Sequence, residues 1–514
     1  MCKLLVVFFV LFFQKSVTCD DTFYNDYLDY YQSDLDELIH SFNEKMDYSY
    51  DESSSYMDKL RYRLVNDVES GNFTASSNLS ETNTSGTEQG VKCDQSDPRI
   101  NQPIVDDKES IILNSCYPEK SKESAFVSGE RNRFKTYSGF FSIRVDNESI
   151  TISNHFWLFI SESNCSLEVP LIVFLHASPH TSLLGHFLLQ ENSTLQLVKY
   201  NFLFVEYKTL FGFSFASSTN ETNHPKLIDK ARHVQIMLQD FLIIFPEFRK
   251  VDVYLAGSYE AGKLAELMLF VLNTDEPNST KIPNLKGAII THGALDIDLI
   301  INYSPIWSQN GIIDLHTARF MDAHETLGRA VLKSGDDQQL EYFVLNFLHN
   351  KVSEIQYATK QEQLVSELME NTTLKLFNND EFKTSQNIGD RSYEKKVSFF
   401  EHTSIQECYL NFAQLFGKYK VLYCNGQLDN IYTHSMTTEY LKQMEWPCND
   451  KWYHAPRKLW YKGERLVGYW KKYSNLHQVL IRNTGYSVDL TRPKLYLRMI
   501  ELFVEDQTSS YDCL

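Results

Sequence analysis

The sequence predicts an α/β fold with a mixed, mostly parallel β-sheet flanked by helices. Three observations support this prediction. Short apolar runs typical of buried strands alternate with segments whose apolar residues recur at helical spacing. One strand-like run, 251–256, leads directly into a glycine-bounded turn and then a helix. The span 297–400 has helical patterns and no clear strand, which predicts a helical cap inserted into the sheet domain.

The expected elements follow in chain order. Between several of the strands lie helical patterns, among them 229–245, where seven apolar residues share one helical face, and 261–272, which continues from the turn. Because strands alternate with helices, most neighbouring strands are expected to be parallel. The predicted strands are 139–145, 155–160, 171–175, 202–205, 251–255, 287–290, 421–424 and 478–481.

The first 19 residues have the pattern of a secretory signal peptide. A charged start precedes an apolar run from Leu4 to Phe13, and small residues come before an expected cleavage after Cys19. The apolar run is too short to cross a bilayer, and no later stretch reaches about twenty apolar residues. The sequence therefore predicts a secreted protein without a membrane span. A lysosomal or vesicular lumen is the alternative location, and a short buried helix the alternative interpretation of the segment.

Potential glycosylation sites agree with a secretory route. A single Asn-x-Ser/Thr tripeptide is weak, but ten behind a signal peptide favour a glycoprotein. The candidate asparagines are Asn72, Asn78, Asn83, Asn147, Asn164, Asn192, Asn220, Asn278, Asn302 and Asn371.

Cysteine usage points the same way. Without Cys2 and Cys19, seven of the nine cysteines remain, and most are expected to form disulfide bonds in an oxidising compartment. Seven is odd, so at least one is free or pairs between chains. Cys424 is the candidate for a free thiol, because it ends an apolar strand-like run. No Cys-x-x-Cys or His-Glu-x-x-His motif occurs, so neither a metal nor another cofactor is expected.

Acidic residues concentrate near the N-terminus. The formal net charge is −18, which argues against a nucleic-acid partner. Residues 20–70 hold fourteen acids and four bases, and a Ser/Thr/Asn/Gly-rich stretch follows. We expect 20–98 to be a disordered or partly helical acidic extension, a propeptide or tail, that ends in a linker. Alternatively it is a binding arm, with Tyr27, Tyr30 and Tyr31 sulfated in their acidic surroundings.

The turn after 251–256 has the frame of a hydrolase nucleophile elbow. In that motif, Gly-x-Ser-x-x-Gly or Gly-x-Ser-x-Gly, the serine stands on a sharp strand-to-helix turn. Here the turn runs from Gly257 to Gly262 with Tyr259 at the nucleophile position. Ser258 lies one residue early. For Ser258 to act as the nucleophile, the turn would have to slip by one residue.

Several sequence blocks in order resemble the serine carboxypeptidase family of α/β-hydrolases, most closely its vitellogenic carboxypeptidase-like branch. The resemblance covers about 115–505, within a predicted domain of 99–514, and it implies an α/β-hydrolase fold. The family is often dimeric, but no residue here decides this. The matching blocks are 137–140, 170–179, 204–206 with 212–215, 245–248, the turn itself, 419–429 and 477–486.

The resemblance places the catalytic triad at Tyr259 (nucleophile), Asp429 (acid) and Tyr486 (base). Only Asp429 keeps its family type. A tyrosine hydroxyl is a poor nucleophile without a base, and tyrosine cannot replace histidine as a proton shuttle near neutral pH. His477 also matches a family histidine, but one outside the triad, and is expected to be a packed or capping residue.

Substrate-binding positions of the family have also changed. The two side chains that grip a substrate's carboxylate correspond to His176 and Ser258, and the oxyanion-hole amides to Ser178 and Glu260. Backbone amides survive side-chain changes, so the hole is not automatically lost. His176 is expected to be a surface residue, with contact to a carboxylate as the alternative. Bulky residues at 206–211 are expected to fill part of the cleft.

The sequence thus predicts a secreted, catalytically inactive carboxypeptidase-like protein that serves as a binding or structural scaffold, with a peptide, a protein or a lipid as possible ligand. Asp429 is expected to remain as a structural hydrogen-bond acceptor. The alternative is an active serine carboxypeptidase or acyltransferase that uses Ser258 or a rearranged triad. A third interpretation is a storage or secretion product.

Overall fold

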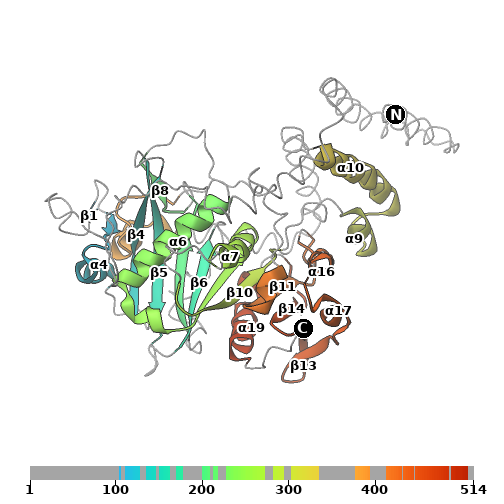
Figure 1. Cartoon of the computed structure of the whole chain (residues 1–514). Helices are drawn as coiled ribbons and strands as arrows, with labels where there is room; N and C mark the ends of the chain where they lie inside the picture. The colour runs from blue at the N-terminus through green and yellow to red at the C-terminus, as the bar shows by residue number, and fades with distance from the viewer. Residues whose placement is uncertain are drawn as a thin grey trace, which may run out of the picture.

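The structure is a computed structural model of the whole chain (Figure 1). The account below concerns the following described residues: 104–105, 110–127, 135–145, 150–161, 169–176, 200–208, 212–217, 227–272, 282–293, 303–334, 375, 377–393, 413–430, 432–444, 446–485 and 488–506.

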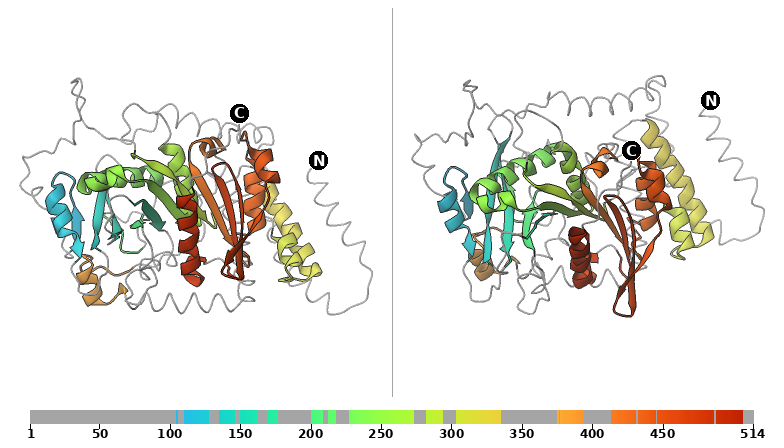
Figure 2. Two further views of the ribbon diagram at one scale, coloured as in Figure 1. Left: turned by 90° about the horizontal axis from the view of Figure 1, so that it is seen from below. Right: turned by 60° about the horizontal axis from the view of Figure 1, so that its bottom comes forward.

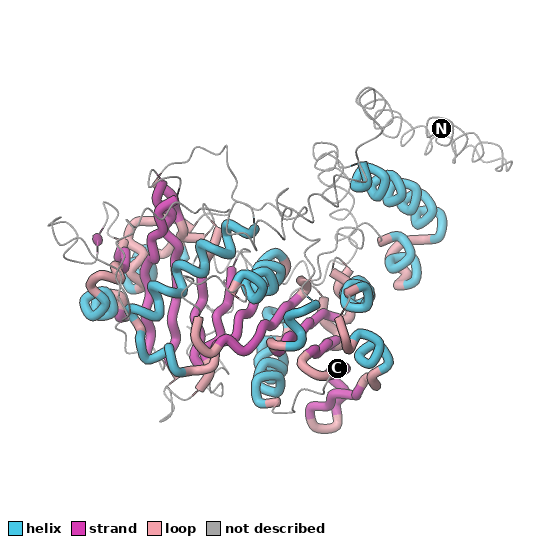
Figure 3. The backbone as a smooth tube through the Cα atoms, viewed as in Figure 1, coloured by secondary structure: helices cyan, strands magenta, loops and turns pink. Residues whose placement is uncertain are grey.

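A twisted fourteen-stranded sheet forms the centre of the molecule (Figure 3). Its six middle strands, β7-β6-β9-β10-β11-β14, are all parallel. These are β7 (Asn201–Glu206), β6 (Leu171–His176), β9 (Val253–Ser258), β10 (Leu285–Thr291), β11 (Lys420–Gly426) and β14 (Leu476–Ile481). Because these strands are buried on both faces, their sequences are almost continuously apolar. The predicted α/β fold with a mixed, mostly parallel sheet is confirmed.

Mostly antiparallel strands extend the sheet on both sides. One side carries β1 (Ile104–Val105), β2 (Ile111–Leu113), β4 (Lys135–Val145) and β5 (Ile150–Ile160), with β3 (Phe126–Val127) and β8 (Phe215–Ala216) paired to β4 and β5. The other side ends in the hairpin of β12 (Lys458–Lys462) and β13 (Arg465–Tyr473). All eight predicted strands are present. The hairpin was not predicted, because β12 is largely exposed, β13 is largely half-buried, and both strands are rich in lysine and arginine.

Helices cover both faces of the sheet (Figure 2). Helices α6 (Leu227–Ile244) and α7 (Glu260–Val271) pack on one face, and their apolar residues join one core cluster with inward-facing strand residues. Helix α19 (Pro493–Glu505) packs on the opposite face, within a second cluster. The helices predicted over 229–245 and 261–272 correspond to α6 and α7. The sheet is therefore the middle layer of three.

Helices also occur between β10 and β11, in the span predicted to form the cap. They are α9 (Ser304–Gln309), α10 (Leu315–Ser334) and α14 (Asp380–Ser385). Figure 1 shows α9 and α10 beyond the end of the sheet, away from α6. The indole N–H of Trp307 on α9 donates to the Asn430 carbonyl at 2.8 Å, which ties this helix to the loop after β11. The cap as a whole remains a prediction.

Shorter helices complete the described structure: α4 (Pro118–Ser124), η3 (Pro246–Lys250), η7 (Ala413–Gly417), α16 (His434–Gln443), α17 (Asn449–His454) and α18 (Val488–Thr491). Of the helices in the described ranges, none is both long and apolar enough to cross a bilayer. The signal-peptide, the acidic-segment and all ten glycosylation predictions fall on residues outside the described ranges.

The cysteine prediction is confirmed for Cys424. Its side chain is buried in β11 and forms no disulfide bond, whereas Cys116 and Cys448 are disulfide-bonded. Burial raises the pKa of the Cys424 thiol far above its usual range, with a smaller contribution from Asp489. At this position cysteine acts as a small apolar side chain.

Candidate active-site region

Tyr259 occupies a sharp turn between β9 and α7. Its backbone dihedral angles are φ 58° and ψ −125°, a combination that residues other than glycine rarely adopt. The turn is held by hydrogen bonds from the Tyr259 N–H to the Thr291 carbonyl at 3.0 Å and from the Gly262 N–H to the Tyr259 carbonyl at 3.0 Å. Such backbone strain costs about 1–3 kcal/mol and persists only where surrounding contacts enforce it. The chain thus forms the strained turn of a nucleophile elbow, and a tyrosine occupies its apex.

Two glycines make this turn possible. A Cβ atom at Gly257 would lie 2.2 Å from the carbonyl oxygen of Ala261, which no real Cβ atom tolerates. At Gly262, a Cβ atom would lie 3.1 Å from both the Gly257 carbonyl oxygen and the side chain of Ile290. The close approach of strand and helix therefore depends on the glycine frame of the motif.

Ser258 does not stand at the apex of the turn. It is the last residue of β9, it is buried, and it pairs in register with Thr291 of β10. A one-residue slip would break this strand register and move Tyr259 into the sheet. In this structure the shifted register is not adopted.

Asp429 pairs with a histidine that the sequence analysis did not single out. The Nδ1 atom of His292 lies 2.5 Å from Oδ2 of Asp429, and both side chains are completely buried. The second carboxylate oxygen, Oδ1, accepts a hydrogen bond from the Tyr432 N–H at 3.0 Å. His292 follows β10 and Asp429 follows β11, which are adjacent parallel strands. Both carboxylate oxygens of Asp429 are thus engaged.

Aromatic rings surround this pair. The ring of Tyr259 stacks on His292 at a centroid distance of 5.5 Å and an interplanar angle of 18°, and it contacts Tyr432 at 5.3 Å. The remaining imidazole nitrogen of His292, Nε2, is buried and has no hydrogen-bond partner among the described residues. In an acyl-transfer enzyme, the hydroxyl group of the nucleophile lies beside the imidazole of the base. In this chain, the phenol ring of Tyr259 stacks on the imidazole of His292.

The residue after the apex, Glu260, anchors a charged cluster. Its carboxylate receives the ammonium groups of Lys208 at 2.9 Å and Lys230 at 3.3 Å, and the Tyr207 hydroxyl donates to it at 3.1 Å. Burial raises the pKa of the Glu260 carboxyl, but the two lysines outweigh burial and lower that pKa to about 2. The cluster fixes β7's C-terminal segment against the first turn of α7.

The structure corrects the expectation for His176. It is the last residue of β6 and only 2% exposed, so it is not a surface residue. Its ring stacks on Phe204, and neither ring nitrogen has a hydrogen-bond partner among the described residues. Burial, with a smaller contribution from His155, lowers the pKa of His176 to about 3. The continuous apolar run before His176 carries it into the core at the strand end.

Neighbouring Glu206, at the end of β7, has a structural role. Its buried carboxylate accepts hydrogen bonds from the N–H groups of Phe213 (2.8 Å) and Ser214 (3.2 Å). A Cβ atom at Gly212, where φ is +66°, would overlap this carboxylate at 2.3 Å. The loop that resembles the family's glycine-containing block therefore folds over Glu206.

His477 is packed, as expected. It lies in β14, 1% exposed, where its Nδ1 atom accepts from the Trp470 indole N–H at 3.1 Å and Nε2 lies 3.5 Å from Asp506. Ser178 and Tyr486 lie outside the described residues. The residue before the latter, Gly485, is in contact with Gly426 at the end of β11, where a Cβ atom would lie 2.0 Å from the Gly485 carbonyl oxygen.

Sequence reasoning missed His292. Only its position in the sequence could have indicated it. His292 lies two residues after the predicted strand 287–290, and functional side chains gather at the carboxyl ends of parallel strands. The described residues contain no cluster of three potential metal ligands.

Comparison with known proteins identifies the family. The family model described as serine carboxypeptidase matches residues 127–506. A venom serine carboxypeptidase of Apis mellifera is 25% identical over 444 residues, covering 77% of this chain and 90% of the relative. A vitellogenic carboxypeptidase of Aedes aegypti is 22% identical, covering 72% and 83%.

Among solved structures, Kex1Δp, a prohormone-processing carboxypeptidase from Saccharomyces cerevisiae, superposes with a TM-score of 0.58 at 16% identity, covering 75% of this chain and 96% of that one. It shares the fold that the sheet order displays. With the match over 127–506, these findings show that the chain belongs to the serine carboxypeptidase family and has the α/β-hydrolase fold.

Proposed function

We propose that this chain is a secreted carboxypeptidase-like protein that has lost hydrolytic activity and acts as a binding scaffold. The observation that carries the proposal is the pairing of Asp429 with His292 beneath Tyr259. In an acyl-transfer triad the acid orients the base that deprotonates the nucleophile. Here one carboxylate oxygen of Asp429 is engaged by His292, and a phenol ring covers that histidine.

Three further features support the loss of hydrolysis. The apex residue is a tyrosine, whose hydroxyl is deprotonated only around pH 10 without a base. The position that resembles the family's base is Tyr486. The carboxylate of Glu260, beside the apex, is already engaged by two lysines and a tyrosine of the chain itself. A peptide, a protein or a lipid remains the class of ligand that such a scaffold would bind.

The decisive experiment tests the purified, glycosylated protein with a fluorophosphonate serine-hydrolase probe and blocked dipeptides from acidic to neutral pH. We expect no labelling and no hydrolysis. Tyr259→Ser with Tyr486→His is the first comparison. Because the His292 side chain already engages Oδ2 of Asp429, we expect this double variant to label weakly. The triple variant with His292→Gly, which removes that side chain at a position of positive φ, should label more strongly. Labelling of the natural protein that disappears in Ser258→Ala would overturn the proposal.

One observation favours a second candidate, an active hydrolase with a rearranged triad. Asp429 and His292 form a buried acid–imidazole pair whose Nε2 atom has no partner among the described residues. Such a pair is two thirds of a triad. For this candidate, hydrolysis would be abolished by His292→Gln, whereas an inactive scaffold has no hydrolysis to lose.

A further inference from the structure

A cavity of about 340 Å³ lies at the far end of the sheet from the strands β1 and β2, between the β12–β13 hairpin and the start of α19. None of its lining residues belongs to the Tyr259, His292 and Asp429 group. Of the eleven lining residues that lie in the described ranges, five are cationic and none is an aspartate or a glutamate. The cations are Lys462, Arg465, Arg482, Arg492 and Lys494.

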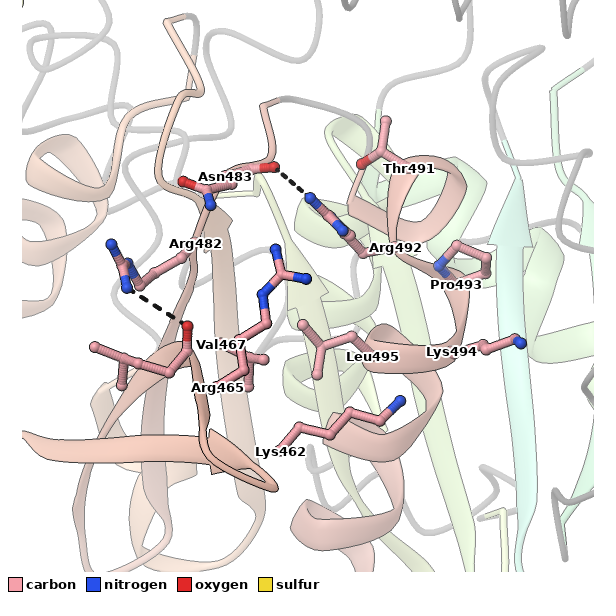
Figure 4. A pocket seen from close by; sticks show the side chains of 11 residues that line it. Lys462, Arg465, Val467, Arg482, Asn483, Thr491, Arg492, Pro493, Lys494 and Leu495 are labelled. Carbon is pink, nitrogen blue, oxygen red and sulfur yellow. Dashed lines mark hydrogen bonds between the residues drawn. The ribbon is translucent and has the colours of Figure 1, made fainter.

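These cations lack carboxylate partners. Within the described parts of the chain, none of the five lies at ion-pairing distance from an acid, although the whole protein has a net charge of −18. Among the described residues, the guanidinium groups of Arg482 and Arg492 donate hydrogen bonds to backbone carbonyls, those of Leu466 at 3.5 Å and Asn483 at 3.4 Å (Figure 4). Like charges gathered without counter-charges repel one another, so an anion between them is stabilising.

Part of the cavity lining is buried. Val467 and Leu495 are each 9% exposed and form an apolar floor, and the Nε atom of Arg482 is buried without a hydrogen-bond partner among the described residues. Figure 4 shows Arg465 extending past Leu495 toward Asn483 and Arg492, whereas the Arg482 side chain points outward, to the carbonyl of Leu466. The positive end of the α19 dipole adds to the field here, since Pro493 begins the helix.

We propose that this cavity binds a small molecule carrying two or more phosphate or sulfate groups. Guanidinium groups donate parallel hydrogen bonds to tetrahedral oxyanions, and this cavity is lined by three arginines, Arg465 of β13, Arg482 after β14 and Arg492 at the start of α19. Phosphate and sulfate esters present the same charged oxygens, and a cavity of this size admits a sugar or diphosphate ligand rather than a single ion.

Isothermal titration calorimetry on the full-length glycosylated protein tests the proposal with two probes, pyrophosphate and a disulfated disaccharide. We expect at least one to bind with 1:1 stoichiometry, and which one binds identifies the source of the oxyanion. Lys462→Gln with Arg465→Gln should weaken binding by at least about tenfold, because two cationic donors to the ligand's charged oxygens are lost. Both side chains are exposed, so folding should not suffer.

The matched control removes two exposed lysines outside the cavity, Lys451→Gln with Lys458→Gln. It changes the net charge equally and should bind as the natural protein does. Absence of binding by both probes at low ionic strength would overturn the proposal. So would equal weakening in the control, because the effect would then reflect overall charge and not this cavity.

Discussion

The ring of Tyr259 lies over the imidazole of His292 at 18° from parallel, and that imidazole in turn holds the carboxylate of Asp429. The three residues come from the ends of three adjacent parallel strands, β9, β10 and β11. Each contact helps to enforce the next, so the strained turn at the half-buried Tyr259 packs against a fully buried acid–imidazole pair.

Replacing Tyr259 should separate backbone strain from ring packing. Tyr259→Ala keeps the backbone strain at φ 58° and removes the stacked ring, whereas Tyr259→Gly removes both. We expect the glycine variant to be more stable than the alanine variant by about 1 kcal/mol, despite glycine's greater freedom in the unfolded chain. Urea unfolding of both variants measures this difference. The reverse order would mean that the turn is not strained.

The His292–Asp429 pair should respond differently to leucine and to asparagine. His292→Leu leaves a buried carboxylate with one fewer partner, and we expect a loss of about 3–5 kcal/mol in the free energy of unfolding. His292→Asn should cost less, because an amide donates a hydrogen bond and asparagine tolerates the φ of 54° at this position. Additive effects of His292→Leu and Asp429→Asn in a double-mutant cycle would contradict the pairing.

Acid should weaken the protein through Glu260. The pKa of this carboxyl is about 2 in the folded protein against 4.5 for an ordinary glutamate, so the unfolded chain binds more protons between these values. The stability that ionised Glu260 contributes is therefore present above pH 4.5 and is lost as the pH falls toward 2. In Glu260→Gln this part of the pH dependence should disappear. Unfolding free energies measured across that range, with the exposed Glu464→Gln as the control, test this expectation.

His176 should act over a higher pH window. Its folded pKa of about 3 lies below the ordinary 6.5, so the unfolded chain gains a proton first as the pH falls. Stability should be unaffected above pH 6.5 and should decline between 6.5 and 3. His176→Phe keeps a ring against Phe204 and should flatten this decline, whereas replacement of the exposed His454 should not. Parallel slopes for natural protein and His176→Phe would contradict the burial of a neutral imidazole.

The central sheet was predictable because its information is local. Strands buried on both faces must be apolar along their length. The glycines mark the turn, because a Cβ atom would clash with backbone at Gly257 and make tight contacts at Gly262. The β12–β13 hairpin gave no such signal, since its partly exposed strands tolerate charged residues. Apolar patterns in a sequence indicate which residues are buried. A half-exposed hairpin at the edge of a sheet buries few residues, so its sequence shows no clear apolar pattern.

The positions of site residues were predictable only where they depend on residues nearby in the sequence. Tyr259 was placed at the apex from glycine spacing, but the partner of Asp429 lies 137 residues away, on a strand whose adjacency to β11 follows from the sheet order. His176 was expected at the surface because a histidine is polar, yet the strand that it ends carries it inward. Both results depend on tertiary packing, which no local pattern contains.

The buried thiol of Cys424 can be used to measure the opening of the native structure. It sits in the middle layer of the molecule without a disulfide partner, and its raised pKa keeps it protonated and unreactive at neutral pH. A maleimide should therefore modify Cys424 only when β11 separates from its neighbouring strands. The alkylation rate then measures how often the native sheet opens.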